Sequence, residues 1–387
     1  MPKPLSTGLA AALTSLALTP TLGAQQPART YIVVFTPDAP DVPAFAQALA
    51  RRHGGRLDFV YEHALRGFSA ELSPRAAAAL AHHPAIAFVE EDAPVSLHGQ
   101  RVPTGIQRIF ARANPTIPLG WGEEHIVDVD VAVLDTGVDR QHPDLTVFAG
   151  TDCTHPVRMT CAGDGDDDHQ HGTHVAGTIA ARDNGFGVVG VAPGARIWAV
   201  KVLDRHGHGS IATLLAGLDW ITRHADAIEV ANISLGAATK SAAIDQAIEK
   251  AVQAGIAFAV SAGNLDDDAA DYSPARSPHV LTVSALADFD GRPGGEAPEG
   301  CRRDHDDTLA DFSNWGPAVD LAAPGTCILS TLPVERGGYG LATGTSMAAP
   351  HVAGALALLA SRKNPESAAD VLALYATIKR AGNLSYT

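Results

Sequence analysis

The chain has 387 residues, of which 46% are apolar and 18% charged, a composition typical of soluble globular proteins with room for two or three domains. A net charge of −15, without any cluster of lysine and arginine, argues against nucleic acids and anionic membranes as partners. We expect a soluble monomer that is either an enzyme or a protein-binding module.

Residues 1–24 have the pattern of a secretory signal peptide. Lys3 precedes an apolar stretch from Gly8 to Leu18, and the segment ends in Leu-Gly-Ala. The stretch is too short to span a bilayer, and no later segment reaches about 18 apolar residues. We therefore predict a secreted protein, extracellular or periplasmic, without a membrane segment.

Residues 31–92 form a self-contained pattern. Strands are predicted at 31–35, 57–61, 67–72 and 86–90, with helices over 43–53 and after Ser73-Pro74. The order β-α-β-β-α-β is that of a small α+β, ferredoxin-like domain.

From residue 106 onward strands and helices alternate, which predicts an α/β fold: a mostly parallel sheet with helices on both faces. The predicted strands are 129–134, 197–202, 230–235, 257–261 and 280–283, and helices begin near 172, 210 and 241. Ligands of such sheets bind beyond the carboxyl ends of the strands. Asp135, residues 234–236 and Asn264 lie there, whereas residues 287–311 are predicted to be a surface insertion.

Four cysteines in an exported chain permit three disulfide pairings. The simplest joins the close neighbours, Cys153 with Cys161 and Cys301 with Cys327. A metal site built from all four thiolates needs pairs spaced as C-x2-C, which neither pair has. We therefore favour two disulfides that staple loops.

Three segments are unusual for packing alone. The apolar strand before Asp135 leads into a carboxylate whose burial is costly without a hydrogen-bonded partner. His171 begins H-G-T-H-V-A-G at a predicted helix start, and Ser346 lies in G-T-S-M-A-A-P-H at another, where backbone N–H groups are unpaired. A serine nucleophile needs an imidazole base, and that base needs a carboxylate.

These motifs, in the order Asp, His, Ser, resemble those of the subtilisin family of serine peptidases between about residues 100 and 360. The resemblance implies a serine endopeptidase in which Asp135, His171 and Ser346 form a catalytic triad and an acyl-enzyme is formed. Asn264, in S-A-G-N, is similar to the family's side-chain oxyanion donor, and His174 is implied to be structural.

The resemblance also implies a cleft in which the substrate backbone is added as a strand. Its implied residues are Ser234, Leu235 and Gly236 on one edge, Gly207 and Gly209 on the other, and Ala262 and Gly263 in the first specificity pocket. The lack of bulk and charge in that pocket favours large apolar or aromatic side chains. Ile211 is implied to border a more distant apolar pocket.

Residues 25–98 resemble the family's inhibitory propeptide, and residues 99–387 the peptidase domain. Residues 100–106 are similar to the beginning of a mature subtilisin, which implies a zymogen that cuts itself after His98, within about two residues. The propeptide would then be an intramolecular inhibitor of its own peptidase, whose other partners are polypeptide substrates.

The loop after the predicted His171 helix is similar in length to the calcium loop of bacterial subtilisins. The implied ligands of this structural calcium are the side chains of Gln100, Asp144 and Asn184 and the carbonyls of Arg182, Phe186 and Val188. Gln100 would join only after cleavage frees the new N terminus. The acidic run 164–168 is interpreted as a solvated loop beside His171.

Two alternative functions make expectations that the sequence does not meet. A catalytically silent, subtilisin-like binding module should have lost a triad residue or Asn264, and none is lost. An esterase on an α/β scaffold should carry its serine in G-x-S-x-G ahead of the histidine, and this chain does not.

Overall fold

The computed structural model describes residues 29–92, 99–109, 125–157, 160–298 and 300–382. Two compact units are found, one within residues 1–96 and the other within 97–387. The predicted signal peptide and the predicted cleavage after His98 lie outside the described residues. None of the helices in those described ranges is long and apolar enough to cross a membrane.

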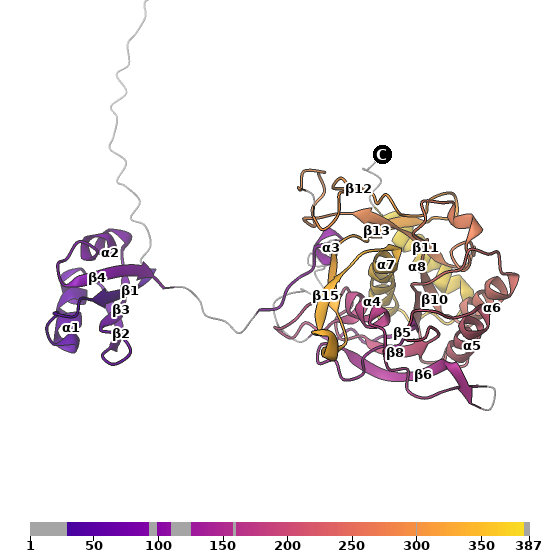
Figure 1. Cartoon of the computed structure of the whole chain (residues 1–387), viewed down its shortest axis with the longest axis horizontal. Helices are drawn as coiled ribbons and strands as arrows, with labels where there is room; N and C mark the ends of the chain where they lie inside the picture. The colour runs from indigo at the N-terminus through magenta and orange to yellow at the C-terminus, as the bar shows by residue number, and fades with distance from the viewer. Residues whose placement is uncertain (1–28, 93–98, 110–124, 158–159, 299, 383–387) are drawn as a thin grey trace, which may run out of the picture. The chain divides into compact units, whose positions relative to one another are not determined.

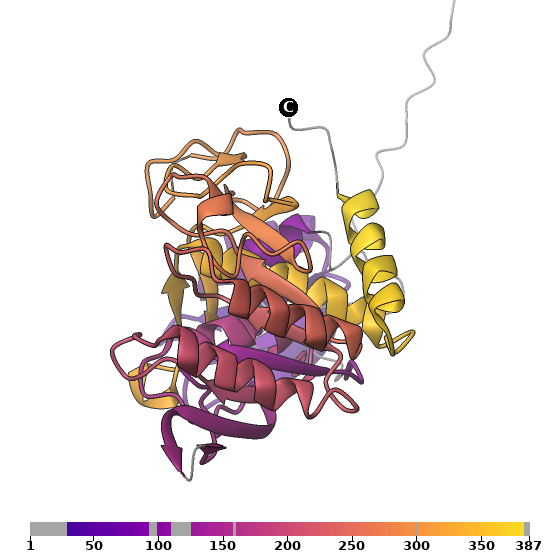
Figure 2. The same ribbon diagram turned by 90° about the vertical axis from the view of Figure 1, so that its right-hand side faces the viewer.

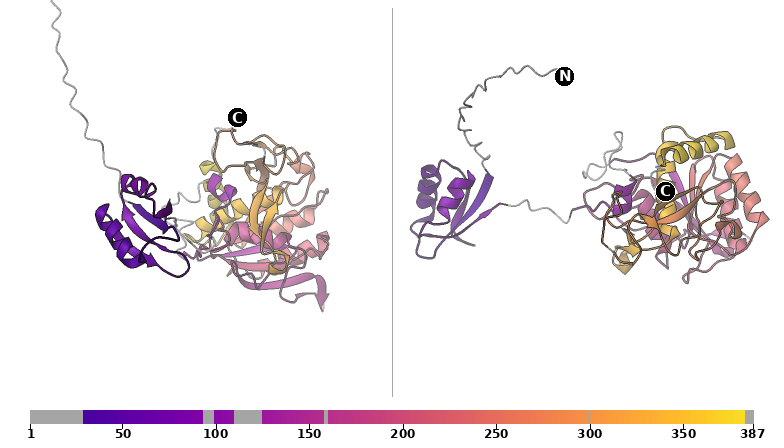
Figure 3. Two further views of the ribbon diagram at one scale, coloured as in Figure 1. Left: turned by 60° about the vertical axis from the view of Figure 1, so that its left-hand side comes forward. Right: turned by 90° about the horizontal axis from the view of Figure 1, so that it is seen from above.

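The first unit is a four-stranded antiparallel sheet with two helices on one face (Figure 3). Its elements are β1 (Arg29–Phe35), α1 (Val42–Arg52), β2 (Arg56–Tyr61), β3 (Gly67–Leu72), α2 (Pro74–Leu80) and β4 (Ile86–Glu91). Strand order β2-β3-β1-β4 confirms the predicted ferredoxin-like arrangement. Asp41 and Ser73 cap the two helices, and both helices carry proline in their first turn, which suits helix starts.

The second unit is built on a nine-stranded sheet. Its strands are β5 (Asp130–Asp135), β6 (Thr146–Val157), β7 (Thr160–Ala162), β8 (Arg196–Lys201), β9 (Val230–Ile233), β10 (Ala257–Ser261), β11 (Leu281–Ala287), β12 (Thr308–Leu309) and β13 (Leu321–Pro324). The order is β12-β11-β10-β9-β5-β8-β6-β7, and β13 also pairs with β11. The pairs β6–β7 and β11–β12 are antiparallel, and the others are parallel, as predicted.

Helices cover both faces of this sheet (Figures 1 and 2). On one face α4 (His171–Ala180) packs against α7 (Thr345–Ala360), and on the other α5 (Ile211–Thr222) lies beside α6 (Ala242–Gln253). The remaining elements are α3 (Thr104–Arg108), α8 (Ala368–Ala381), the short helices Ala269–Asp271 and Val334–Arg336, and the hairpin of β14 (Ile328–Thr331) with β15 (Tyr339–Ala342). Because the sheet is covered twice, all six residues of β5 are buried.

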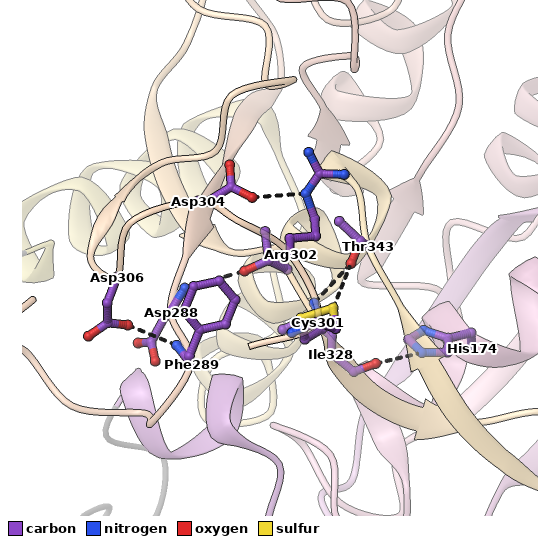
Figure 4. The surroundings of a disulfide bond; sticks show 11 residues. His174, Asp288, Phe289, Cys301, Arg302, Asp304, Asp306, Ile328 and Thr343 are labelled. Carbon is purple, nitrogen blue, oxygen red and sulfur yellow. Dashed lines mark hydrogen bonds and ion pairs between the residues drawn. A yellow bond between two sulfur atoms is a disulfide. The ribbon is translucent and has the colours of Figure 1, made fainter. Parts of the chain in front are cut away.

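Both favoured disulfides are present, Cys153–Cys161 and Cys301–Cys327. The second ties the predicted insertion 287–311 to the segment just before β14 (Figure 4). The insertion is less exposed than expected, because Asp288, Asp304 and Asp306 are buried. Arg108 of α3 pairs with Asp288 at 2.7 Å and also with Asp307, so ion pairs anchor the insertion to α3.

Candidate active site

Three neighbouring strands bring the predicted residues to one edge of the sheet. Strands β5, β9 and β10 are adjacent and parallel. Asp135 is the last residue of β5, Ser234 follows the last residue of β9, and Asn264 lies three residues beyond β10. The carboxyl ends of parallel strands meet at one edge, so the fold gathers these side chains although they are far apart in the sequence.

Asp135 and His171 form a short hydrogen bond. Nδ1 of His171 lies 2.7 Å from Oδ1 of Asp135, which also accepts the N–H of Thr136 at 2.7 Å. Asp135 is completely buried, whereas 26% of the His171 side chain is exposed. A carboxylate oxygen can only accept, so the imidazole carries its proton on Nδ1 and presents Nε2 as the free base.

The environment of His171 favours its protonated form. Burial lowers the pKa of His171, but the charge and hydrogen bond of Asp135, with the charge of Asp167, outweigh burial and raise the pKa above its ordinary value. The helix starts so close to the segment at the end of β5 that a side chain at Gly172 would overlap the carbonyl oxygen of Gly137. Only glycine lets His171 approach Asp135 this closely.

Asp167 fixes the start of the His171 helix, a role that sequence reasoning missed. Its Oδ1 accepts the N–H groups of His169 and Gln170, and its Oδ2 accepts both the N–H and the hydroxyl of Thr173. The side chain of Thr136 links it to the helix: this hydroxyl donates to Asp167 and accepts the N–H of Gly172. Asp167 is buried, so the interpretation of run 164–168 as a solvated loop is wrong at this position.

Ser346 is the second residue of α7 and is partly exposed. Its hydroxyl donates to the carbonyl oxygen of Ser234 at 3.0 Å. Over the described ranges, no hydrogen bond joins this hydroxyl to His171. A rotation about the Cα–Cβ bond of serine is a fast motion that redirects the hydroxyl without moving the backbone.

Asn264 is held at the start of α7 through its amide oxygen. Its Oδ1 accepts the N–H and the hydroxyl of Thr345, each at 2.8 Å. A Cβ atom built on Gly344 would lie 3.4 Å from Nδ2 of Asn264 and 3.7 Å from both Oδ1 of Asn264 and the backbone nitrogen of Ser346. Two nitrogen donors thus border one small space that glycine leaves open.

The residues predicted for the cleft occupy two places. Gly207, Gly209, Leu235 and Gly236 line a cavity of about 340 Å³, and Ile211, predicted for a more distant pocket, lines the same cavity. Ser234, Ala262 and Gly263 do not line this cavity: Ser234 and Gly263 contact the start of α7, and Ala262 is buried in a small cluster with Ala269 and Ala275. The hydroxyl of Ser234 donates to the carbonyl of Ser346, and the N–H of Gly263 donates to the hydroxyl of Thr345.

The predicted calcium ligands converge, with one exception. The amide of Gln100 contacts the carbonyl oxygens of Arg182 at 2.5 Å and of Val188 at 3.0 Å, and Asn184 contacts Asp144 at 3.0 Å. Phe186 is tied to the loop through its N–H, which Asn184 accepts, and no contact of its carbonyl is seen within the described ranges. Gln100 makes these contacts in the uncleaved chain, contrary to the expectation that cleavage must come first.

Two features of this cluster fit a cation. Oε1 of Gln100 is buried without a hydrogen-bond partner, whereas Nε2 of the same amide donates to two carbonyl oxygens. Asp144 is completely buried, and burial raises its pKa to about 6 despite hydrogen bonds from Val188, Asn184 and Tyr339. A divalent cation bound to oxygen ligands would satisfy both groups.

His174 has the structural role expected of it. It is buried in α4, and its Nε2 lies 2.9 Å from the carbonyl oxygen of Ile328 (Figure 4) and 3.2 Å from that of Gly340. Both acceptors belong to the β14–β15 hairpin, so His174 fastens this hairpin to α4.

Comparisons with known proteins show the family to which the chain belongs. Residues 127–383 match the sequence profile of the subtilase family, and residues 30–98 match that of peptidase inhibitor I9. An alkaline protease of Alkalihalobacillus alcalophilus is 41% identical over 77% of this chain and 69% of its own length. Subtilisin E of Bacillus subtilis strain 168 is 38% identical over 80% of this chain and 74% of its own.

A solved structure is also similar. The crystal structure of a cold adapted subtilisin-like serine proteinase is 33% identical, with a TM-score of 0.57, and the match covers 73% of this chain and 93% of that protein.

Proposed function

The chain belongs to the subtilase family and is a serine endopeptidase with an inhibitor I9 propeptide domain, and from this premise we propose that Asp135, His171 and Ser346 are its catalytic triad. The observation that carries the proposal is the 2.7 Å contact between Nδ1 of His171 and buried Asp135, which leaves Nε2 free to act as a base.

In the proposed reaction, the Ser346 oxygen attacks the carbonyl carbon of a peptide bond while its proton passes to Nε2 of His171. The imidazolium then gives this proton to the departing amine, and an ester to Ser346 remains. Water attacks the ester, again losing a proton to His171, and releases the acid. Asp135 stabilises the imidazolium throughout and stays ionised.

The tetrahedral intermediates carry a negative oxygen, which we place in the space above Gly344. Nδ2 of Asn264 and the N–H of Ser346 are the proposed donors, and the bonds from Thr345 to the Asn264 carbonyl oxygen support this orientation. Donors fixed in advance stabilise a developing charge without reorganising.

Substrate is proposed to lie as an extended strand between residues 234–236 and the loop of Gly207 and Gly209. The cavity of about 340 Å³ between these segments supports an apolar side-chain subsite, since Ile211, Leu214 and Leu235 line it. Ala262 and Gly263 are proposed to line the first pocket and to favour large apolar or aromatic side chains.

The activity is tested with a peptide p-nitroanilide that carries phenylalanine at the cleaved bond, and with the same peptide carrying glutamate. The parent should hydrolyse the first much faster, and the Ser346→Ala and His171→Ala variants should lose activity about 10⁴–10⁶-fold. Full activity of the Ser346→Ala variant would overturn the proposal and favour another nucleophile, and a folded but inactive parent would favour a silent binding module.

Residues 25–98 are proposed to act as an intramolecular inhibitor that the peptidase removes by cleavage after His98. The match of residues 30–98 to peptidase inhibitor I9 and the separate compact unit support this. Mass spectrometry of the purified parent and of Ser346→Ala tests it. A cut between residues 95 and 101 in the parent alone is expected, and the same cut in the variant would contradict self-processing.

Calcium is proposed as a structural cofactor held by Gln100, Asp144 and Asn184 with the carbonyls of Arg182, Phe186 and Val188. The buried Gln100 oxygen and the buried Asp144 carboxyl support it. The ion would stabilise the loop after α4. We also propose that residues 1–24 direct secretion and that the enzyme acts as a monomer.

A further inference from the structure

Helix α7 cannot bond the carbonyl group of Ser346 in the usual way. In an α-helix this oxygen accepts the N–H of the residue four positions later, which here is Pro350. Proline has no N–H, so the backbone acceptor of the proposed nucleophile lacks its helical donor. The hydroxyl of Ser234 replaces that donor at 2.8 Å.

This bond dictates the orientation of a second side chain. The Ser346 carbonyl can only accept, so the single hydrogen of the Ser234 hydroxyl is committed to it. The Ser234 oxygen can then only accept from its other neighbour, Asn232, whose Nδ2 lies 2.9 Å away. If the amide were turned to present its oxygen, Ser234 would have to donate to Asn232 and would release the Ser346 carbonyl.

Asn232 is a polar side chain whose burial is costly. Its side chain is completely buried in β9, and its Oδ1 has no hydrogen-bond partner over the described ranges. An unpaired buried oxygen destabilises the folded state, which an apolar side chain of similar shape would avoid. The amide therefore contributes something other than stability.

We propose that Asn232 is a positioning residue for Ser346 and acts through the hydroxyl of Ser234. This inference rests on the proposed role of Ser346 as nucleophile. The Ser234 hydroxyl holds the backbone of Ser346 through the Ser346 carbonyl, whereas the Ser346 hydroxyl, which donates to the Ser234 carbonyl at 3.0 Å, must rotate toward His171 to react. A shift of Ser346 would displace its oxygen and its N–H together, and misplacement by about 1 Å can cost about 10²-fold in rate.

The test uses full chains produced with calcium and compares Ser234→Ala, Asn232→Leu and the double variant. Two quantities are measured: kcat and KM on the phenylalanine p-nitroanilide, and the rate at which diisopropyl fluorophosphate modifies Ser346. Ser234→Ala should lower kcat and the modification rate about tenfold, with KM within about twofold. Asn232→Leu should lower both by about threefold to tenfold, and the double variant should be no slower than Ser234→Ala.

Pro350→Ala provides the sharpest comparison, because alanine restores the N–H that the Ser346 carbonyl lacks. In that background Ser234→Ala should lower kcat by only about twofold, since the helical bond substitutes for the lost hydroxyl. In the parent background, Ser234→Thr keeps a hydroxyl donor and should retain most of the kcat that Ser234→Ala loses. Thermal unfolding should show Asn232→Leu close to the parent, so that lost activity is separated from lost folding.

Ser330→Ala is the matched control. The Ser330 hydroxyl is also buried and donates to a helix carbonyl, that of His174, at 2.7 Å. The residue four positions beyond His174 is Thr178, which keeps its N–H, so kcat should stay within about twofold of the parent.

If Ser346 reacts normally in the parent, three results would overturn this inference but not the proposed function. They are an unchanged kcat in Asn232→Leu, losses of kcat that multiply in the double variant, and an equal loss of kcat from Ser234→Ala with and without Pro350. An unreactive Ser346 in the parent would instead overturn the proposed function, and this inference with it.

Discussion

Nδ1 of His171 lies 2.7 Å from Oδ1 of Asp135, at the meeting point of a buried strand and a helix start. Asp135 is fully buried, and its second oxygen has no hydrogen-bond partner over the described ranges. A buried carboxylate with so few donors attracts the imidazolium strongly. This relationship sets both the orientation and the basicity of His171.

Replacing Asp135 should therefore change both rate and pH dependence. Asp135→Asn should lower kcat/KM about 10⁴-fold, because an amide does not stabilise the imidazolium and can select the wrong tautomer. In the parent, His171 must be neutral to act, and its raised pKa means that activity falls as pH drops through a value above 6.5. The variant retains the burial that lowers the pKa, so its acid limb should move to lower pH. An unmoved limb in a pH profile of kcat/KM would contradict this.

Asn264 allows its two proposed roles to be separated. Asn264→Ala should lower kcat about 10²–10³-fold with little change in KM, the size known for this kind of donor in a subtilisin. Asn264→Asp keeps an oxygen for the Thr345 bonds but loses the amide donor. Steady-state kinetics should therefore find it as slow as the alanine variant, whereas recovery by aspartate would mean that Asn264 only holds Thr345.

Calcium removal should destabilise the peptidase domain. At a calcium concentration of about 100 times Kd the ion contributes about 2.7 kcal/mol, so chelation should lower Tm by about 5–10 °C. Gln100→Ala should weaken the dependence of Tm on calcium, since the buried Gln100 oxygen would be removed. Asp164→Asn, in the acidic run 164–168 outside the proposed calcium site, serves as the control. Equal calcium dependence in Gln100→Ala and the parent would contradict the proposed site.

Two buried histidines should make the fold acid-sensitive. Burial lowers the pKa of His174 and of His351 to about 4, below the ordinary value of 6.5. The unfolded chain therefore binds more protons than the folded one between pH 6.5 and 4, and stability is lost as pH falls through that window, by about 3 kcal/mol for each histidine.

Urea unfolding of Ser346→Ala, which cannot digest itself, measures this loss. His351→Gln cannot be protonated in that range and can still donate to the carbonyl of Met347, so it should reduce the pH dependence by about half. A free energy of unfolding that does not change between pH 7 and 4 would rule out the histidine explanation.

Local patterns predicted most of the architecture. Alternating strands and helices, the predicted helix starts near Ser73, Ser210 and Ser241, and the apolar run into Asp135 all identify elements that the structure confirms. The 12-residue β6 was not predicted, because its polar residues and proline do not follow a strand pattern.

The parts of the site that were missed depend on contacts distant in sequence. Asp167 lies in a run of acids that looks solvated, and only the fold places its oxygens under the start of α4. Likewise, Pro350 marks a missing helical bond, but nothing local indicates that Ser234 supplies the substitute. Motifs predict the reacting groups, whereas tertiary contacts show which side chains orient the residues of the proposed site.

The most direct test of the catalytic assignment is the site and rate of modification by diisopropyl fluorophosphate, measured by peptide mass spectrometry. We predict one adduct per chain, on Ser346, absent from Ser346→Ala and formed several orders of magnitude more slowly in His171→Ala. An adduct on another residue, or modification of Ser346 at the same rate without His171, would contradict the account.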